Sequence, residues 1–380
     1  MSLGTTLRLA RPGAAAFAAM GMVWGSFAAD LPDVKAMLGV DEQRLGLLLF
    51  LTPFAAVASM LATPWTGAWA GRRALLVASL IMCAAFQLPG HFASVWVFPL
   101  AMLACGAGTG MTDVLLSARI SAVENTRGVH LMNLCHAAYS FGYAGAAIAT
   151  GQMRTAGWSP AWVLGTIAAA AAVVALATYE TDGTVHGLRR KKDRVRAGLD
   201  LMPLIGGGMV AIAYLSENAA ENWSALHIEQ TLGGSPANGA MGPAALALTM
   251  GVSRLVGQSL AQRVSSTVVL TAGAGIASIG SLTAALAATP AIAYLGFIVM
   301  GAGASVLVPT SFSLIGRLAD PETRTRAIAR ATMLGYFGYF IGPPVVGIIA
   351  GQLGLRAAFV FAAAAFLTIP LMNRVLRNIS

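Results

Sequence analysis

The feature that most constrains this chain is a series of apolar runs, each long enough to span a bilayer, along almost its whole length. About 20 consecutive apolar residues suffice to cross the hydrocarbon core of a membrane. The chain is 57% hydrophobic and only 10% charged, whereas soluble domains carry about a quarter charged residues. The runs are continuous and do not alternate with a period of two, which excludes an outer-membrane β-barrel. The pattern therefore predicts an all-α membrane protein.

The runs predict twelve transmembrane helices, six on each side of a strongly charged linker at 181–200. We expect these helices near residues 14–36, 44–66, 74–92, 95–119, 130–152, 160–179, 201–226, 237–262, 268–288, 291–316, 327–352 and 356–373. The predicted domains are accordingly an N-terminal six-helix bundle at 1–180, a cytoplasmic basic linker at 181–200 and a C-terminal six-helix bundle at 201–380.

Short stretches recur in the same order in the two halves. "CGAGTG" at 105–110 is similar to "MGAGAS" at 300–305, and "SFGYAG" at 140–145 is similar to "YFGYFI" at 336–341. Two parallel repeats of this kind are typical of secondary transporters, in which the halves move about a central site.

The formal net charge of +9 is explained by topology. With both termini in the cytoplasm, most arginines and lysines lie in cytoplasmic segments, as the positive-inside rule requires. Only Lys35, Arg44, Arg154 and Arg356 then lie at outer loops. The chain is expected to be a multi-pass protein of the bacterial inner membrane, and no nucleic-acid partner is expected.

Five stretches of the chain resemble the major facilitator superfamily, and the likeness extends over essentially the full length. They are "SFAADLPDVKAMLGVDEQRLGLLL", "GMTDVLLSARISAVE", "LMNLCHAAYSFG", "ENWSALHI" and "GYFIGPPVVGIIAGQLGLRAAF". Within that family the chain is most similar to the fucose-permease-like branch and to related uncharacterised bacterial inner-membrane transporters. The resemblance implies a fold of two six-helix bundles and transport by alternating access.

The segments that would control gating depart from the family pattern. The loop between the second and third helices reads "GAWAGRRAL", which keeps Arg72 and Arg73 but lacks the acid that helps to latch the family's outward-open state. The equivalent loop, "GQSLAQRVSST", has Arg263 and also lacks an acid. Arg72 and Arg73 are expected to pair with an inner acid such as Glu124 or with lipid phosphate. Pro343 and Pro344 are expected to break the eleventh helix and free carbonyls to line a cavity.

A polar stretch, "AYLSENAAENWSALHIEQ", ends the predicted helix 201–226 and contains the first candidate site. Glu217 lies about 24 Å into that helix, still inside the hydrocarbon core. At 100° per residue, Tyr214, Glu217, Asn218 and Glu221 share one stripe, with Asn222 at its margin. A carboxylate facing lipid is costly, so the stripe is expected to face the bundle interior. It would bind substrate and a proton, or else form a hydrogen-bond network that only fastens helices.

Three further groups are candidates for proton coupling or binding. Asp30 lies at a depth similar to that of Glu217, and its alternative role is to order the helix exit near Lys35. Asp113 and His136 come from consecutive predicted helices and could relay protons, with Asn133 nearby, or form a structural tie. Arg254 is the one arginine well inside a predicted helix, and it would hold an anionic substrate or belong to an inner charge network.

We interpret the chain as a secondary active transporter and proton symporter for a small polar metabolite, either sugar-like or an organic acid. The predicted partners are this substrate, protons and the bilayer, and the protein is expected to be a monomer and not an enzyme. No metal or cofactor is expected, because Cys83, Cys105 and Cys135 lack metal-like spacing and no nucleotide-binding loop is present. The expected coupling residues are Glu217, Asp30, Asp113 and His136. The expected substrate-binding residues are Asn218, Glu221, Asn222, Asn133, Trp24, Tyr139, Tyr214, Tyr336, Tyr339 and Arg254.

Two alternatives stay open at this stage. The first is an exporter of drugs or other hydrophobic or cationic compounds, which acidic residues at the outer mouth would attract. The Gly-Pro signature of drug–proton antiporters is missing from "SFGYAGAAIATG" in the fifth predicted helix, which disfavours this alternative. The second is a membrane scaffold or sensor that transports nothing.

Overall fold

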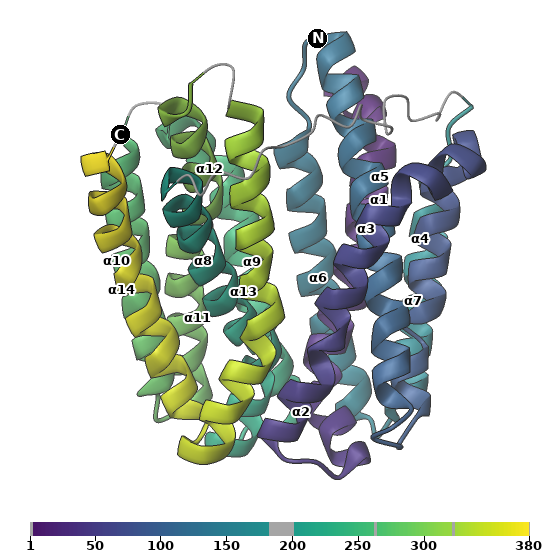
Figure 1. The fold of residues 1–380 in the computed structure, drawn as a ribbon. Coiled ribbons are helices and arrows are strands. Elements are labelled where there is room, and N and C mark those ends of the chain that lie inside the picture. The colour runs from purple at the N-terminus through teal and green to yellow at the C-terminus, as the bar shows by residue number, and fades with distance from the viewer. Residues whose placement is uncertain (1–2, 182–200, 262–263, 321–323, 380) are drawn as a thin grey trace. The chain divides into compact units, whose positions relative to one another are not determined.

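The computed structural model describes residues 3–181, 201–261, 264–320 and 324–379 (Figure 1). Within these ranges every regular element is a helix and none is a strand. The chain forms two compact units, one made of 1–40 and 51–193 and the other of 41–50 and 194–380. The all-α architecture predicted from the apolar runs is therefore confirmed. The predicted linker lies outside the described residues except for Thr181.

The first unit is a helical bundle arranged around its N-terminal helix. α1 packs most extensively against α6, and it also contacts α7, α5 and α4. The bundle's elements are α1 (Leu3–Leu38), α3 (Leu51–Ala70), η1 (Gly71–Arg73), α4 (Ala74–Ala85), η2 (Leu88–His91), α5 (Phe98–Arg127), α6 (Met132–Thr155), α7 (Pro160–Ala175) and η3 (Leu176–Thr178).

The second unit has α8 at its centre, packed chiefly against α13 and α14. Its elements are α2 (Glu42–Leu49), α8 (Leu201–Leu226), the π-helical turn η4 (His227–Thr231), α9 (Pro236–Ala261), α10 (Ser266–Ala285), α11 (Pro290–Ala304), α12 (Leu307–Leu318), α13 (Arg324–Leu353) and α14 (Leu355–Ile379). The short helix α2 packs on α13 and so groups with this unit, although the sequence placed it in the N-terminal bundle.

Two predicted helices are each divided in two. The predicted span 44–66 is α2 followed by α3, and the predicted span 291–316 is α11 followed by α12. The eleventh predicted helix, in contrast, is continuous. α13 passes through Pro343 and Pro344 without interruption, so the expectation that these prolines break the helix is wrong.

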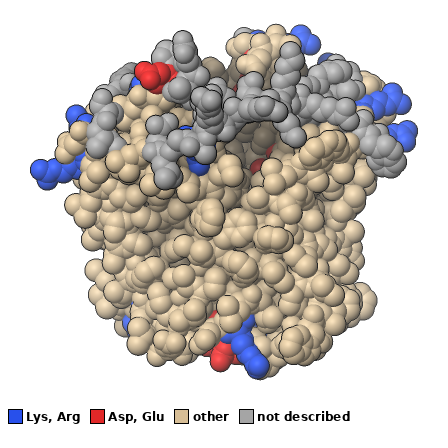
Figure 2. Space-filling model, in the orientation of Figure 1, with Lys and Arg blue, Asp and Glu red and all other residues tan. Residues whose placement is uncertain are grey.

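The helices differ in length and hydropathy, and so in whether they meet the composition of a transmembrane span. Nine helical spans of the described residues are long and apolar enough to cross a membrane. Neither α6 nor α8 is among them, and these two helices carry many of the polar residues selected above. On the face shown in Figure 2, charged side chains gather at two edges and leave a wide uncharged belt between them.

Glycine allows α1 and α6 to approach closely. Gly21 and Gly25 lie one turn apart on α1, in the small-xxx-small pattern that lets membrane helices pack backbone to backbone. A Cβ atom at Gly25 would overlap the carbonyl oxygen of Tyr143 on α6, and one at Gly21 would overlap that of Tyr139. Any side chain at either position must therefore push the two helices apart.

Replacing Gly25 by alanine should consequently destabilise the first unit by about 1–3 kcal/mol, the usual cost of overpacking. We expect a lower apparent unfolding temperature of the purified protein in detergent. The matched control is Gly145→Ala on α6, where an added Cβ meets no atom within 4 Å. An equal loss of stability in both variants would contradict the close-approach explanation.

Candidate functional site

The polar stripe on α8 is the candidate site in the second unit. α8 spans Leu201–Leu226, the range predicted from the sequence. Its opposite face is packed, with Trp223 fully buried. On the stripe, Tyr214 and Glu221 are half-buried and Glu217 is only 6% exposed. The stripe is therefore buried at Glu217 and partly exposed at Tyr214 and Glu221.

Glu217 faces a cation from the neighbouring helix α9. The Nη2 atom of Arg254 lies 3.6 Å from Oε1 of Glu217, within a unit that α8 and α9 share. This distance is longer than a hydrogen bond, so the attraction is mainly Coulombic. Arg254 of α9 thus lies against the polar stripe of α8 and pairs with Glu217, one of the stripe's two acids.

The amides on the stripe are buried and incompletely hydrogen-bonded. Asn222 donates from Nδ2 to the backbone carbonyl of Asn218, at 3.3 Å. The Oδ1 atom of Asn218 is buried and has no hydrogen-bond partner among the described residues. It lies beside Gly342 of α13, where a Cβ would be 3.1 Å from it. Because buried polar atoms are normally hydrogen-bonded, this oxygen is a natural acceptor for a ligand donor.

Three tyrosines form a cluster between α8 and α13. The rings of Tyr214 and Tyr339 are stacked, with centroids 4.4 Å apart and planes inclined by 29°. Tyr336 completes the cluster, with its centroid 6.3 Å from each of the other two. All three side chains are half-buried. The structure therefore brings together the tyrosines that the sequence proposed separately, one turn of helix away from Glu217.

The proline pair of α13 packs against α2. The carbonyl oxygen of Pro343 lies where a side chain at Gly46 would sit, so α2 approaches α13 closely at this point. Phe50, which follows α2, packs edge-on against Phe340 of α13. The backbone around Pro343 is accordingly engaged in helix packing.

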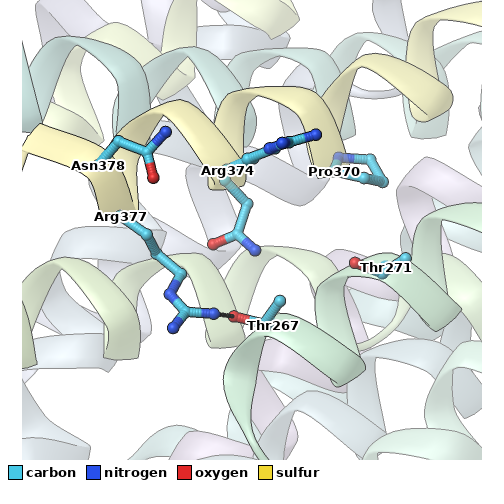
Figure 3. Close-up of a pocket in the computed structure, with 7 residues that line it drawn as sticks. Thr267, Thr271, Pro370, Arg374, Arg377 and Asn378 are labelled. Carbon is cyan, nitrogen blue, oxygen red and sulfur yellow. Dashed lines mark hydrogen bonds between the residues drawn. The ribbon is translucent and has the colours of Figure 1, made fainter.

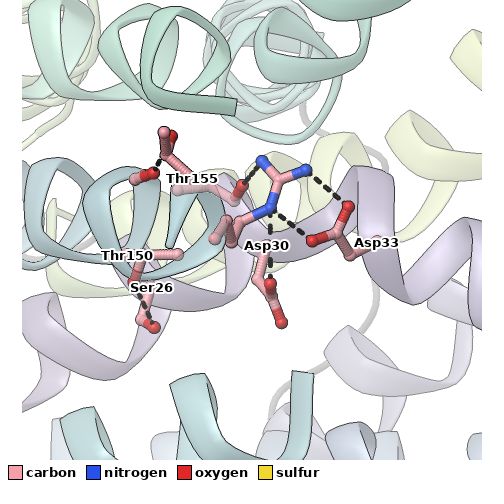
Figure 4. Close-up of polar contacts among 8 residues, drawn as sticks. Ser26, Asp30, Asp33, Thr150 and Thr155 are labelled. Carbon is pink, nitrogen blue, oxygen red and sulfur yellow. Dashed lines mark hydrogen bonds and ion pairs between the residues drawn. The ribbon is translucent and has the colours of Figure 1, made fainter. Parts of the chain in front are cut away.

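An ion network in the first unit joins the ends of α1 and α6 (Figure 4). Arg154 donates two hydrogen bonds to Asp33, at 2.7 and 2.8 Å, and a third to the carbonyl oxygen of Ala29, at 2.7 Å. Its Nε also lies 3.6 Å from Oδ1 of Asp30, and the side chains of Arg154 and Asp30 are both completely buried. One turn away, the hydroxyls of Ser26 and Thr150 are 2.7 Å apart.

The sequence analysis missed Arg154, the buried cation of this network. The fifth helix was predicted to end at 152, which placed Arg154 in an outer loop, whereas α6 continues to Thr155. One sequence feature could have indicated its position: Thr150 and Arg154 are four residues apart, which places them on one face if the helix continues to Arg154. Asp30 is therefore paired with an arginine of α6.

Asp113 and His136 are on helices that barely pack together. α6 lies mainly along α1 rather than along α5, and His136 packs its ring on Phe17 of α1, with centroids 4.4 Å apart. Within the described residues Asp113, which is half-buried, makes no hydrogen bond or ion pair. Arg119, which follows Asp113 on α5, binds Glu180 through two hydrogen bonds of 2.9 and 3.0 Å. The expected Asp113–His136 relay is therefore not formed.

The remaining N-terminal candidates are mostly packing residues. Trp24 donates to the hydroxyl of Thr109, at 3.2 Å, and its ring contacts Phe86 edge-on. Tyr139 lies against Tyr143, with centroids 5.9 Å apart. Asn133 is half-buried near the start of α6.

The two arginines that were expected to control gating are exposed at the turn η1. Arg72 and Arg73 form no hydrogen bond or ion pair with any residue in the described ranges. Glu124, their expected partner, instead accepts hydrogen bonds from the backbone N–H groups of Leu131 and Met132 and so caps the start of α6. Arg263 lies outside the described residues.

Comparison with known proteins identifies the class of this fold. A family model described as Major Facilitator Superfamily matches residues 13–206 and 205–379. The chain is 28% identical over 362 residues to an uncharacterized MFS-type transporter of Yersinia pestis, covering 93% of this chain and 92% of the relative. It is 23% identical over 347 residues to the membrane protein MosC of Rhizobium meliloti, covering 90% and 84%. Among solved structures, the nucleoside transporter NupG matches with a TM-score of 0.76 and 14% identity, covering 99% of both chains.

Proposed function

Because this chain belongs to the Major Facilitator Superfamily, we propose that it is a secondary active transporter that couples the movement of a small polar metabolite to protons. The observation that carries the proposal is the pairing of the buried Glu217, on the polar stripe of α8, with Arg254. Intramembrane ionisable residues are costly and mark substrate pathways or proton relays in transporters. The proposed location is the bacterial inner membrane, with transport by alternating access.

The pair suggests how proton binding could be linked to substrate binding. When Glu217 is ionised, it attracts Arg254 and competes with any anion for that guanidinium. Protonation of Glu217 removes this competition, so that Arg254 faces only Glu221 among the acids of the stripe. An anionic substrate would then bind together with a proton, which is symport. Of the two substrate classes indicated by the sequence, Arg254 therefore favours an organic acid.

The neighbouring groups suit a substrate that also has hydroxyls or a flat surface. The unpartnered Oδ1 of Asn218 can accept a hydrogen bond from a hydroxyl. The tyrosine cluster offers ring faces and phenolic hydroxyls beside it. We therefore propose a hydroxylated organic acid as the substrate class. The fucose-permease-like branch stays part of this proposal, supported by "ENWSALHI" in α8 and η4.

A ligand-stabilisation screen tests the proposed substrate class. The purified protein is heated with hydroxylated organic acids, and with neutral sugars of equal size as the matched control. A ligand at 100 times its dissociation constant should stabilise the protein by about 2.7 kcal/mol. We expect the organic acids to raise the unfolding temperature, and more strongly at lower pH. Stabilisation by the neutral sugars alone would overturn the assignment of an anionic substrate.

Topology is proposed from the distribution of cations within each unit. In the first, Arg11 at the start of α1 bonds the carbonyl of Tyr179, which follows η3. In the second, Arg317 at the end of α12 bonds Ser266 at the start of α10. In each unit an arginine thus lies where two helix ends meet, as expected of a cytoplasmic face.

Cysteine labelling tests this topology. The native cysteines, Cys83, Cys105 and Cys135, are buried free thiols, so a cysteine introduced in place of Arg190 should give a clean signal. With the linker in the cytoplasm, a membrane-impermeant maleimide should label this site only after the cells are opened. Trp96, 86% exposed in the segment between η2 and α5, is the matched outer position, and Trp96→Cys should be labelled in intact cells. Labelling in the reverse order would overturn the proposed orientation.

A further inference from the structure

A polar pocket lies between α10 and α14, apart from the α8 stripe (Figure 3). It has a volume of about 470 Å³ and is found where α10 begins and α14 ends. The polar residues that line it are Thr267, Thr271, Asn373, Arg374, Arg377 and Asn378. The transport proposal uses none of these residues.

The pocket is positively charged. Its lining among the described residues contains two guanidinium groups and no acid. Arg377 donates to the hydroxyl of Thr267, at 3.1 Å, whereas Arg374 makes no hydrogen bond or ion pair within the described residues. Thr267 belongs to the first turn of the 20-residue helix α10, whose N-terminus adds positive partial charge; the N-cap Ser265 already accepts the N–H of Val268. These groups together suit a phosphate.

A buried amide provides an independent sign of a ligand. Asn373 is only 1% exposed and lines the pocket, and its Oδ1 has no hydrogen-bond partner among the described residues. Buried polar atoms rarely go without a partner in folded proteins. The amide oxygen can only accept a hydrogen bond. The ligand that completes this site therefore carries a hydrogen-bond donor, such as a hydroxyl, as well as an anion.

The surroundings of the pocket are those of the membrane interface. α10 and α14 are among the spans apolar enough to cross a bilayer. Leu367, Leu371 and Val375 on α14 and Val268 on α10 are all about half exposed or more, next to the pocket's polar residues. A ligand here would meet charged groups at the helix ends and apolar side chains along the helices. This combination matches a lipid with its headgroup in the pocket.

We propose that this pocket binds the phosphoglycerol headgroup of an anionic phospholipid. The phosphate lies between Arg374, Arg377 and the N-terminus of α10, as charge-assisted hydrogen bonding favours. The glycerol hydroxyl donates to Oδ1 of Asn373, and the acyl chains follow the exposed leucines of α14. A soluble glycerol phosphate shares the headgroup chemistry but would leave the apolar surface uncovered.

Native mass spectrometry with defined lipids tests the site. The full chain is exchanged into micelles containing equimolar phosphatidylglycerol and phosphatidylcholine with identical acyl chains. The wild-type protein should retain phosphatidylglycerol at least about tenfold more than phosphatidylcholine, because only phosphatidylglycerol has a net negative charge and free glycerol hydroxyls; tenfold corresponds to about 1.4 kcal/mol. The double variant Arg374→Gln/Arg377→Gln should lose this preference.

The control variant Arg8→Gln/Arg127→Gln removes two exposed arginines of the first unit and should keep the preference. Equal retention of the two lipids by the wild-type protein, or an unchanged preference in the Arg374/Arg377 variant, would overturn the proposal. Asn373→Leu keeps the side-chain volume and the arginines, so it tests the hydroxyl contact without loss of charge. This variant should weaken phosphatidylglycerol relative to phosphatidic acid, whose headgroup lacks the glycerol.

A competition experiment distinguishes a phospholipid headgroup from soluble glycerol phosphate, which carries the same phosphate and hydroxyl groups. Soluble glycerol phosphate is added at millimolar concentration to the wild-type protein carrying phosphatidylglycerol. Retention of the lipid supports the membrane source. Full displacement by glycerol phosphate would show a site for the soluble ester and would overturn the lipid assignment.

Discussion

Glu217→Gln should abolish uphill accumulation of substrate while leaving exchange of substrate across the membrane intact. The reason is that glutamine resembles the protonated acid, so the variant keeps Arg254 free of its carboxylate but can no longer take up or release a proton. One pH unit supplies about 1.4 kcal/mol per proton, which drives up to about tenfold accumulation. In proteoliposomes with such a gradient, the accumulation ratio of the variant should fall to one.

Glu221→Gln is the matched control, because Glu221 lies one turn further along the same stripe and is half-buried rather than buried. This variant should weaken substrate binding but keep accumulation driven by the pH gradient. Uphill accumulation by Glu217→Gln with an unchanged pH dependence would show that Glu217 is structural. The coupling group would then be sought at Asp113, which has no partner in the described part of the chain, or at Asp30.

The fold could be predicted because it depends on properties that are periodic along the chain. A run of about 20 apolar residues predicts a transmembrane helix, because a chain that crosses the bilayer must form its backbone hydrogen bonds internally. The boundaries of α8 were predicted in this way, and so was the location of the acids on one stripe. The break between α11 and α12 was missed, because hydropathy is averaged over many residues and does not register an interruption as short as Ser305 and Val306.

The partners of the site residues could not be predicted, because they come from helices that are distant in the sequence. Arg254 is 37 residues from Glu217 along the chain, counted from their numbers, and only packing of α9 on α8 brings them together. The cluster of Tyr214 with Tyr336 and Tyr339 likewise depends on α8 lying along α13. The Asp113–His136 prediction failed for the same reason. Helices that follow one another in the sequence need not pack together, and α6 packs on α1 rather than on α5.

Arg154→Met should destabilise the protein more than any other single change considered, by about 3–5 kcal/mol. Arg154 is completely buried and is the cation that the network presents to Asp33 and Asp30. Methionine preserves much of the side-chain volume, so the loss measures the charge and hydrogen bonds rather than a cavity. Without the guanidinium, a buried carboxylate is left facing apolar surroundings, which is far costlier than losing the pair as a whole.

The charge explanation can be separated from a simple loss of packing between α1 and α6. In the triple variant Arg154→Met/Asp30→Asn/Asp33→Asn the acids are neutral, so most of the lost stability should return, although the same arginine is missing. Arg356→Met is the matched control: Arg356 also donates to a backbone carbonyl, that of Ala285, at 2.8 Å, but it is exposed. The control should change the apparent unfolding temperature only slightly. Failure of the triple variant to recover would mean that Arg154 acts by filling space between the helices, and the ion network would then not be what fastens α1 to α6.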